Sequence, residues 1–360
     1  MPIAINGSGT LTGLSVGGLE DGIITPAELS TGAPSWDAQY NLTNVASINT
    51  GPLAGFRNAI INGNFNIWQR GTSFTGSEYG ADRWLNARSG TTHTVTRQPF
   101  TLGQTDVPGE PTYFCRTVVS SVAGAGNYAI AIQAIEGVRA FAGQQATISF
   151  WAKADASKNI AIDCQQNFGT GGSPSSAVNA IGTVKKALTA SWQKITHTFT
   201  ITSVAGKTLG TDGNDSLALF IWFDAGSTFN ARTDSLGQQS GTFDIAQVQI
   251  EPGPVATPFE RRPLGTELAL CQRYFCITKA VTRFRPTVIN EIAETPIYWP
   301  VQMRVNPTTV TITAGSRTNI VSVLVQSDSG TTGGRHIVTA SAANLDTYSF
   351  NDVITASAEL

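Results

Sequence analysis

QQATISFWAKA, residues 144–154, carries the clearest structural signal in this 360-residue chain. Apolar residues recur at every second position, at Ile148, Phe150 and Ala152, and Trp151 falls in the opposite phase. A period of two is typical of a β-strand that buries one face. The stretch therefore predicts a strand whose Phe150 face is buried and whose Trp151 side chain lies on the other face.

Similar segments follow this one along the chain, separated by loops rich in Gly, Asn and Asp. They are KNIAIDCQQ (158–166), SWQKITHTFTI (191–201), LALFIWF (217–223) and GTFDIAQVQIEPG (241–253). LALFIWF is apolar on both faces, which predicts a central strand covered on both sides. A phase shift at Ala246 or Gln247 in the last segment predicts a β-bulge. Strands at this spacing predict an all-β sandwich or barrel over residues 56–262.

The regions that flank this domain have different patterns. Residues 263–276 predict one helix, because Leu264, Leu268, Cys271 and Phe275 fall on a single helical face. Residues 277–360 return to β alternation, which predicts a small C-terminal β-sandwich domain. Residues 1–55 are too rich in glycine to bury a core alone, and they predict an extended arm.

Composition excludes several classes of function. Only 13% of the residues are charged, against roughly 25% in an average globular domain, and the formal net charge is -2. Without a basic footprint, nucleic-acid binding is not expected. The longest apolar runs fall short of a membrane span, so membrane insertion is not expected either. The four cysteines match no metal or redox spacing and are expected to be buried, reduced thiols.

The chain lacks the motifs of common enzymes. There are three histidines, and none lies in a metal or nucleophile motif. Glycoside hydrolysis needs a pair of carboxylates, but the spacing of the acidic residues singles out no pair. The prediction is that this protein is not an enzyme, with an accessory module or enzyme acting on surface polysaccharide as an alternative.

Several segments resemble jelly-roll carbohydrate-binding modules. They are NGNFNIW (62–68), TISFWAKA (147–154), SWQKITHTFTI (191–201) and FDIAQVQI (243–250). The resemblance implies a jelly-roll β-sandwich that binds a glycan through aromatic side chains, with Trp151 and Trp222 as candidates on the faces away from the core. Such modules often hold a structural calcium ion, for which Asp244 is the candidate ligand. No other cofactor is implied.

Other segments resemble bacteriophage tail-fibre and related virion-surface proteins. They are NAIINGNFNIWQRGTSFTGSEYGADRW (58–84), VATPFERRPLGTELALCQRYF (255–275), ITPAELSTGAPSWD (24–37) and DVITASAEL (352–360). The resemblance implies a homotrimeric virion protein, a tail fibre that is assembled in the host cytoplasm and binds the host surface, with a cement-like head-decoration fibre as the alternative. It also implies that the arm binds another virion protein through Ile24, Pro26, Leu29 and Trp36; the alternative is a flexible extension without a role.

Overall fold

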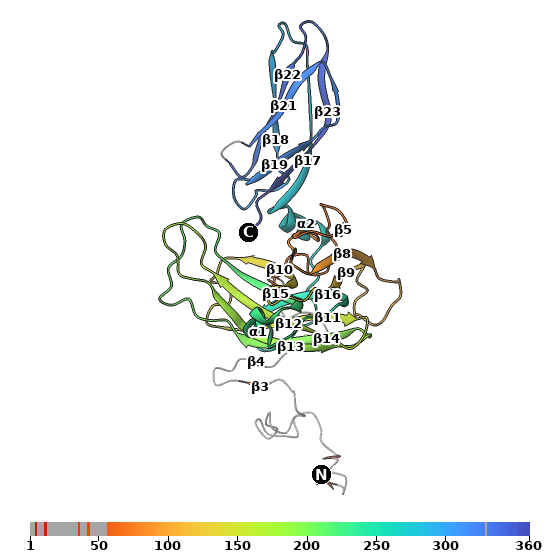
Figure 1. The fold of residues 1–360 in the computed structure, drawn as a ribbon, viewed down its shortest axis with the longest axis vertical. Coiled ribbons are helices and arrows are strands. Elements are labelled where there is room, and N and C mark those ends of the chain that lie inside the picture. Colours follow the sequence, from red (N-terminus) through yellow and green to blue (C-terminus); the bar gives the residue numbers. More distant parts are fainter. Residues whose placement is uncertain (1–3, 6–10, 13–34, 37–41, 44–55, 328–329) are drawn as a thin grey trace. The chain divides into compact units, whose positions relative to one another are not determined.

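The computed structural model describes residues 56–327 and 330–360, together with four short strands in the arm (Figure 1). These strands are β1 (Ala4–Ile5), β2 (Leu11–Thr12), β3 (Ser35–Trp36) and β4 (Leu42–Thr43), paired β1 with β2 and β3 with β4. The chain divides into two compact units, residues 1–55 and 56–360. Of the predicted attachment residues, Ile24, Pro26 and Leu29 lie outside the described residues, and only the backbone of Trp36 is described.

Two six-stranded antiparallel sheets form the β-sandwich that the sequence predicts. The first, here the β15 sheet, has the order β13-β12-β15-β10-β7-β6, and the second, the β11 sheet, has the order β14-β11-β16-β9-β8-β5. The strands are β5 (Ser73–Phe74), β6 (Glu78–Tyr79), β7 (Leu85–Ser89), β8 (Thr92–Pro99), β9 (Tyr113–Ser120), β10 (Tyr128–Glu136), β11 (Gln145–Ala154), β12 (Lys158–Asn167), β13 (Val178–Leu188), β14 (Gln193–Thr200), β15 (Ser216–Ala225) and β16 (Gly241–Pro252). The fold is an all-β jelly roll.

Strand faces in the sandwich agree with the alternation in the sequence. Ile148 and Phe150 of β11 are fully buried in the main core. β15 is buried along its whole length and pairs with β10 and β12, so the prediction of a doubly covered central strand is confirmed. The predicted bulge is also present, because the register between β11 and β16 shifts beside Ala246 and the backbone of Gln247 has a φ of 53°.

The predicted helix is present but ends earlier than expected. α2 spans Leu264–Gln272, and Phe275 already begins the next strand. Leu264 is exposed rather than on a buried helical face, and Cys271 is the buried residue of the helix. Two other short helical segments, η2 (Ser227–Phe229) and α1 (Asn230–Thr233), follow β15. Among the described residues, no helix has the length and apolar character to cross a membrane.

Residues after α2 form two further antiparallel sheets. One contains β17 (Phe275–Phe284), β23 (Thr347–Ser357), β19 (Thr309–Thr313) and β20 (Ser316–Thr318); the other contains β18 (Ile292–Tyr298), β22 (Gly333–Ala340) and β21 (Ile320–Ser327). Their apolar residues make a separate small core that includes Trp299, Met303 and Ile354. This C-terminal β domain lies at the blue end of the chain in Figure 1.

Candidate functional site

The outer face of the β11 sheet gathers two of the predicted site residues. Trp151 lies opposite Lys194 and Ala246, and two positions along the same strand Lys153 lies opposite Asp244. Arg116 of β9 lies on the other side of Asp244 in the sheet. Alternation places all these side chains on the face away from the core, so β11, β16 and β9 build a row of charged side chains beside Trp151.

Ion pairs organise this row of charges. Arg116 binds Asp244 through two parallel hydrogen bonds, from Nε to Oδ1 and from Nη2 to Oδ2, both 2.8 Å long. The Nζ of Lys153 lies 3.8 Å from the same carboxylate. The hydrogen bonds to Asp244 raise the pKa of the Arg116 guanidinium. Both cations remain partly exposed, with 35% of the Arg116 side chain and 29% of the Lys153 side chain accessible to solvent.

An aromatic cluster adjoins the charged row. The ring of Trp192, just before β14, lies 5.2 Å from Phe100 and 5.4 Å from Phe114, and Phe100 and Phe114 lie 4.9 Å apart between centroids. The Nζ of Lys153 lies 5.2 Å from the Trp192 ring, within cation–π range. Trp192 and Phe100 are half-buried, so the cluster presents aromatic surface beside the ion pairs.

An open groove runs along this surface. Its cavity has a volume of about 380 Å³ and is lined by Arg116, Lys153, Ala154, Asp155, Ala190, Thr242 and Asp244. We call it the outer groove, and we include the adjoining rings of Trp192, Phe114 and Phe100. Ligand sites of roughly 300–1,000 Å³ commonly combine aromatic walls with a few placed polar groups. The outer groove combines a cavity lined mainly by polar and charged side chains with an aromatic cluster that adjoins it at the contact between Lys153 and Trp192.

Asp244 does not fit the predicted calcium site. Calcium needs six to eight oxygen ligands, with several from carboxylates. Here cationic side chains contact both carboxylate oxygens of Asp244. Within residues 56–327 and 330–360, no group of three or more His, Cys, Asp and Glu side chains could hold a metal ion. Asp244, which was expected to bind a calcium ion, instead forms ion pairs with the side chains of Arg116 and Lys153.

Trp222 is not available to a ligand, contrary to the sequence prediction. It lies on the outer face of the β15 sheet, but only 1% of it is exposed. Its indole Nε1–H donates a 2.8 Å hydrogen bond to Asp163, and Arg232 of α1 binds the other oxygen of that carboxylate at 2.8 Å. The ring of Phe229 covers Trp222 at 5.1 Å. The segment after β15 folds back over this face, so Trp222 belongs to a second, small core.

Three of the segments that resemble phage fibre proteins, residues 58–84, 255–275 and 352–360, meet at a structural joint. Arg83, which is 1% exposed, pairs with Glu359 and donates a 2.6 Å hydrogen bond to the carbonyl of Ala134. Its guanidinium also lies 3.5 Å from the ring centroid of Tyr274. Arg70 pairs with the same Glu359 at 3.0 Å. We call this buried cluster the motif joint. It ties Arg70, before β5, and Arg83, between β6 and β7, to Tyr274, just after α2, and to Glu359.

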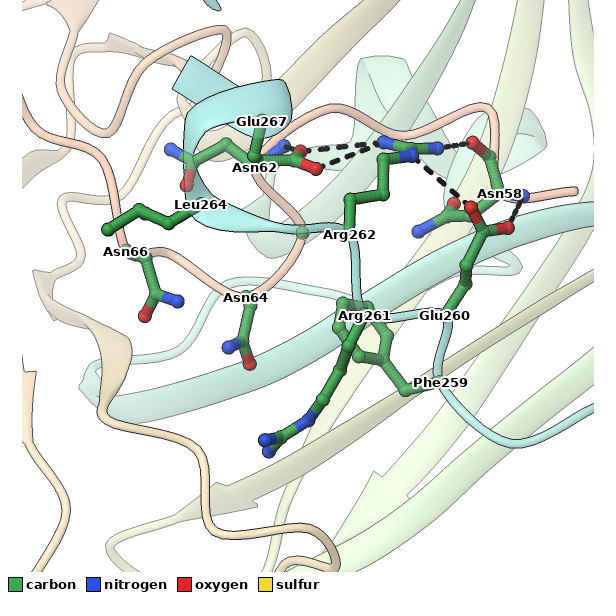
Figure 2. Close-up of a pocket in the computed structure, with 11 residues that line it drawn as sticks. Asn58, Asn62, Asn64, Asn66, Phe259, Glu260, Arg261, Arg262, Leu264 and Glu267 are labelled. Carbon is green, nitrogen blue, oxygen red and sulfur yellow. Dashed lines mark hydrogen bonds and ion pairs between the residues drawn. The ribbon is translucent and has the colours of Figure 1, made fainter. Parts of the chain in front are cut away.

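A second group of ion pairs lies in the same segments, around α2 (Figure 2). Arg262 pairs with Glu260 and with Glu267 of α2, each at 3.3 Å, and donates to the carbonyl of Asn58. Glu260 accepts the backbone N–H of Asn58 at 2.9 Å, and Glu267 accepts that of Asn62. A small cavity of about 140 Å³ opens beside these residues.

The four cysteines are all free and buried, as the sequence predicts. Burial raises the pKa of the Cys115 thiol to about 12, and the other three thiols shift in the same direction for the same reason. The reactive form of cysteine is the thiolate, so these residues are inert parts of the core at neutral pH.

Comparisons with known proteins are limited to solved structures, since no family model and no curated protein matches the chain. The chain is similar to a CBM4 structure at 19% identity, covering 53% of this chain and 98% of that chain, with a TM-score of 0.29. A family 11 carbohydrate-binding module from Clostridium thermocellum, in complex with a β-1,3-1,4-mixed-linked tetrasaccharide, matches at 11% identity, with 52% and 98% covered and a TM-score of 0.28.

A phage protein is also among the similar structures. The enzymatically active domain of tailspike protein 4 from Bacteriophage CBA120 matches at 13% identity, with 56% of this chain and 22% of that chain covered and a TM-score of 0.33. These likenesses assign neither a ligand nor a partner to this chain.

Sequence reasoning found two residues of the outer face but missed the rest of the outer groove. Trp192 and Phe100 lie next to strand ends, where alternation gives no direction for a side chain. Alternation along β9 would have placed Phe114 and Arg116 on one face, because they are two residues apart. Trp151 is half-buried beside the groove, and its role in binding remains a prediction.

Proposed function

We propose that this chain is a structural and receptor-binding component of a bacteriophage particle that recognises a host-surface glycan through the outer groove. One observation carries the glycan site: the aromatic cluster around Trp192 lies directly beside the row formed by Lys153, Asp244 and Arg116. Sugar rings stack on aromatic faces, and their hydroxyls bond to paired charged side chains that are held in place. The tail-fibre assignment is supported by the resemblance of the segments that form the motif joint.

The chemistry of the groove supports binding without turnover. Retaining and inverting glycosidases need one carboxylic acid that donates a proton and one free carboxylate. Asp244 is engaged by Arg116 and Lys153, and Asp155 accepts the backbone N–H of Thr242 at 3.0 Å. The two groove carboxylates therefore have structural partners, and we propose that the protein is not an enzyme.

Self-association as a homotrimer is the second part of the proposal. The outer face of the sheet β18-β22-β21 exposes large apolar side chains, with Ile292 and Leu324 each 58% and Tyr298 75% accessible. Several large apolar side chains exposed on one sheet face often mark a protein–protein contact. Multiple copies would also raise the avidity of weak glycan sites. Light scattering should give three times the 38.0 kDa mass of one chain, and a stable monomer would contradict the trimer.

The arm, residues 1–55, is proposed to attach the protein to another virion protein. The remaining residues, 56–360, form a compact unit of their own. Deleting the arm should leave a folded protein that still binds glycan but no longer enters particles. Normal incorporation of the shortened chain would contradict this part of the proposal.

The glycan site is tested by binding of the purified full chain to polysaccharide extracted from host cells. Trp192→Ala should weaken capture, and Phe350→Ala, which changes an exposed aromatic residue of β23 outside the proposed contact face, should leave capture unchanged. The same samples should be assayed for shortened polysaccharide. Equal capture by the wild-type chain and both variants would refute the glycan site in the outer groove. Accumulation of shortened fragments would refute the proposal that the protein is not an enzyme.

A further inference from the structure

The small cavity beside α2 has the features of a second binding site (Figure 2). It has a volume of about 140 Å³, and its wall consists of Asn58, Asn62, Gly63, Asn64, Asn66, Phe259, Glu260, Arg261, Arg262, Leu264 and Glu267. Sites for drug-sized ligands usually have volumes above about 300 Å³. A ligand of this cavity is therefore small, on the scale of a single sugar ring.

The side-chain oxygens of two asparagines in the cavity wall accept no hydrogen bond. The Oδ1 atoms of Asn64 and Asn66 are buried, and neither has a hydrogen-bond partner in the described residues. Buried carbonyl oxygens are nearly always bonded in folded proteins, and leaving one without a partner costs free energy. Both asparagines belong to the wall of one cavity, so a ligand that donates hydrogen bonds there, as the hydroxyls of a sugar do, would satisfy these acceptors.

The loop that carries these asparagines is held in an unusual backbone shape. Asn62 and Phe65 have positive φ angles, of 55° and 53°. Asparagine adopts such angles more readily than most residues, so the angle of Phe65 is the less common of the two. A Cβ on Gly63 would lie 2.0 Å from the carbonyl oxygen of Val248, so only glycine allows the loop to approach β16 this closely. The Asn62 side chain also bonds the backbone N–H and carbonyl of Ile67. The wall is thus preformed, and strained loops of this kind are concentrated at ligand sites.

The charges around the cavity favour an anion at its mouth. Glu260 and Glu267 are both engaged by Arg262. Arg261 is exposed, and its guanidinium forms no hydrogen bond or ion pair with the described residues. Pro263, at the N-cap of α2, supplies no side-chain bond to the first turn, and an uncapped helix N-terminus attracts negative charge. Arg261 is the cation of the cavity wall that a carboxylate on the ligand would face.

We propose that this cavity binds one acidic sugar unit, with its hydroxyls donating to Asn64 and Asn66 and its carboxylate facing Arg261. The site would be separate from the outer groove and would not depend on it. In a polymeric ligand, the unit would be a terminal uronic acid or a similar polyhydroxylated carboxylate.

The test measures binding of sodium glucuronate to the full chain by saturation-transfer NMR. Glucose, which lacks the carboxylate, is the uncharged control. Glucuronate should bind saturably at millimolar concentrations, and glucose should not bind. Arg261→Gln should weaken glucuronate binding by at least about tenfold, because a charge-assisted contact is lost. Asn64→Ala should weaken it similarly without lowering the melting temperature, because the lost Oδ1 has no partner in the free protein.

Controls separate this site from the outer groove. Trp192→Ala should leave glucuronate binding unchanged, and its loss in that variant would place the ligand in the outer groove and overturn the proposal. Equal binding of glucose and glucuronate, no binding of glucuronate, or full binding by both Arg261→Gln and Asn64→Ala would also overturn it. Failure of the full chain to bind polysaccharide, with glucuronate binding intact, would refute only the function proposed for the outer groove.

Discussion

The motif joint and the outer groove both rely on arginine–carboxylate pairs, but they hold them in different surroundings. In the motif joint, Arg83 is 1% exposed and Glu359 is 8% exposed. In the outer groove, Arg116 keeps 35% of its side chain in contact with solvent beside an almost buried Asp244. A buried pair strongly destabilises the fold when one partner is removed, whereas a partly exposed pair can exchange its partner for a ligand at smaller cost.

The motif joint and the outer groove are also built from different parts of the sequence. The segments that resemble phage fibre proteins, including residues 58–84 and 255–275, supply the buried side chains that join the sandwich to α2 and the chain end. The groove residues lie mostly outside these segments, on ordinary strands. We infer that the recurring segments report how the parts of the chain are connected, and that ligand choice is set elsewhere.

The largest expected effect is the loss of stability when the motif joint is broken. Arg83→Ala leaves Glu359 buried with less compensation, and should lower the free energy of unfolding by about 3–5 kcal/mol. Urea unfolding followed by tryptophan fluorescence measures this change. Arg283→Ala is the matched control, because its pair with Asp346 is 70% and 61% exposed and should contribute no more than about 0.5 kcal/mol. Similar losses in the two variants would contradict the comparison.

A somewhat smaller effect is expected from acid on Asp352 of the C-terminal β domain. Burial opposes its charge, but hydrogen bonds from Ser349, the Gly315 N–H, His336 and Arg317 outweigh burial and lower the pKa of Asp352 to about 2. A lowered carboxylate pKa stabilises the fold above the unfolded value of 3.8, and this stability is lost as pH falls through the folded value.

The expected size of that loss is about 2 kcal/mol between pH ~4 and pH ~2. Denaturant unfolding at a series of pH values should show this slope in the wild-type chain. Asp352→Asn should lose the corresponding part of the slope, while other carboxylates still contribute in both proteins. Identical slopes in the two proteins would show that Asp352 is not held in its charged form.

In the outer groove, Trp192→Ala should reduce glycan affinity by about 1–2 kcal/mol, the scale of one aromatic contact and its buried area. The same change should alter the stability less than Arg83→Ala does, because Trp192 is half-buried at the sandwich surface. Titration calorimetry with a purified oligosaccharide fragment measures the affinity. A variant that binds normally but unfolds easily would place Trp192 with the structural residues.

The smallest effect is expected for Arg116→Lys. Lysine keeps the charge but cannot form the two parallel bonds to Asp244, so the carboxylate is held less rigidly. Affinity should fall by less than about 1 kcal/mol, and binding should become more sensitive to salt. Calorimetry at low and high salt would show this change. Unaltered affinity at both salt concentrations would show that the pair of Arg116 and Asp244 does not contribute to binding.

Local patterns in the sequence were sufficient for the strands but not for the site. Alternation gave the buried face of β11 and the bulge at Gln247, because both depend on neighbouring residues. The prediction for Trp222 was wrong because its cover comes from Phe229 and Arg232, which fold back after a turn. Asp244 meets Arg116 from 128 positions away, and no short-range pattern reports such a register. Arg83 and Glu359 are 276 positions apart, so no short-range pattern predicts their pairing either.

The central claim is that a glycan binds in the outer groove, and fluorine NMR of the 5-fluorotryptophan-labelled chain tests it most directly. The seven tryptophans give separate signals that can be assigned by single Trp→Phe replacements. Titration with a host-surface oligosaccharide should shift the signal of Trp192 most and that of Trp151 to a smaller extent, and should leave the buried Trp222 unchanged. A shift at Trp222, or saturable binding without any change at Trp192, would contradict the account.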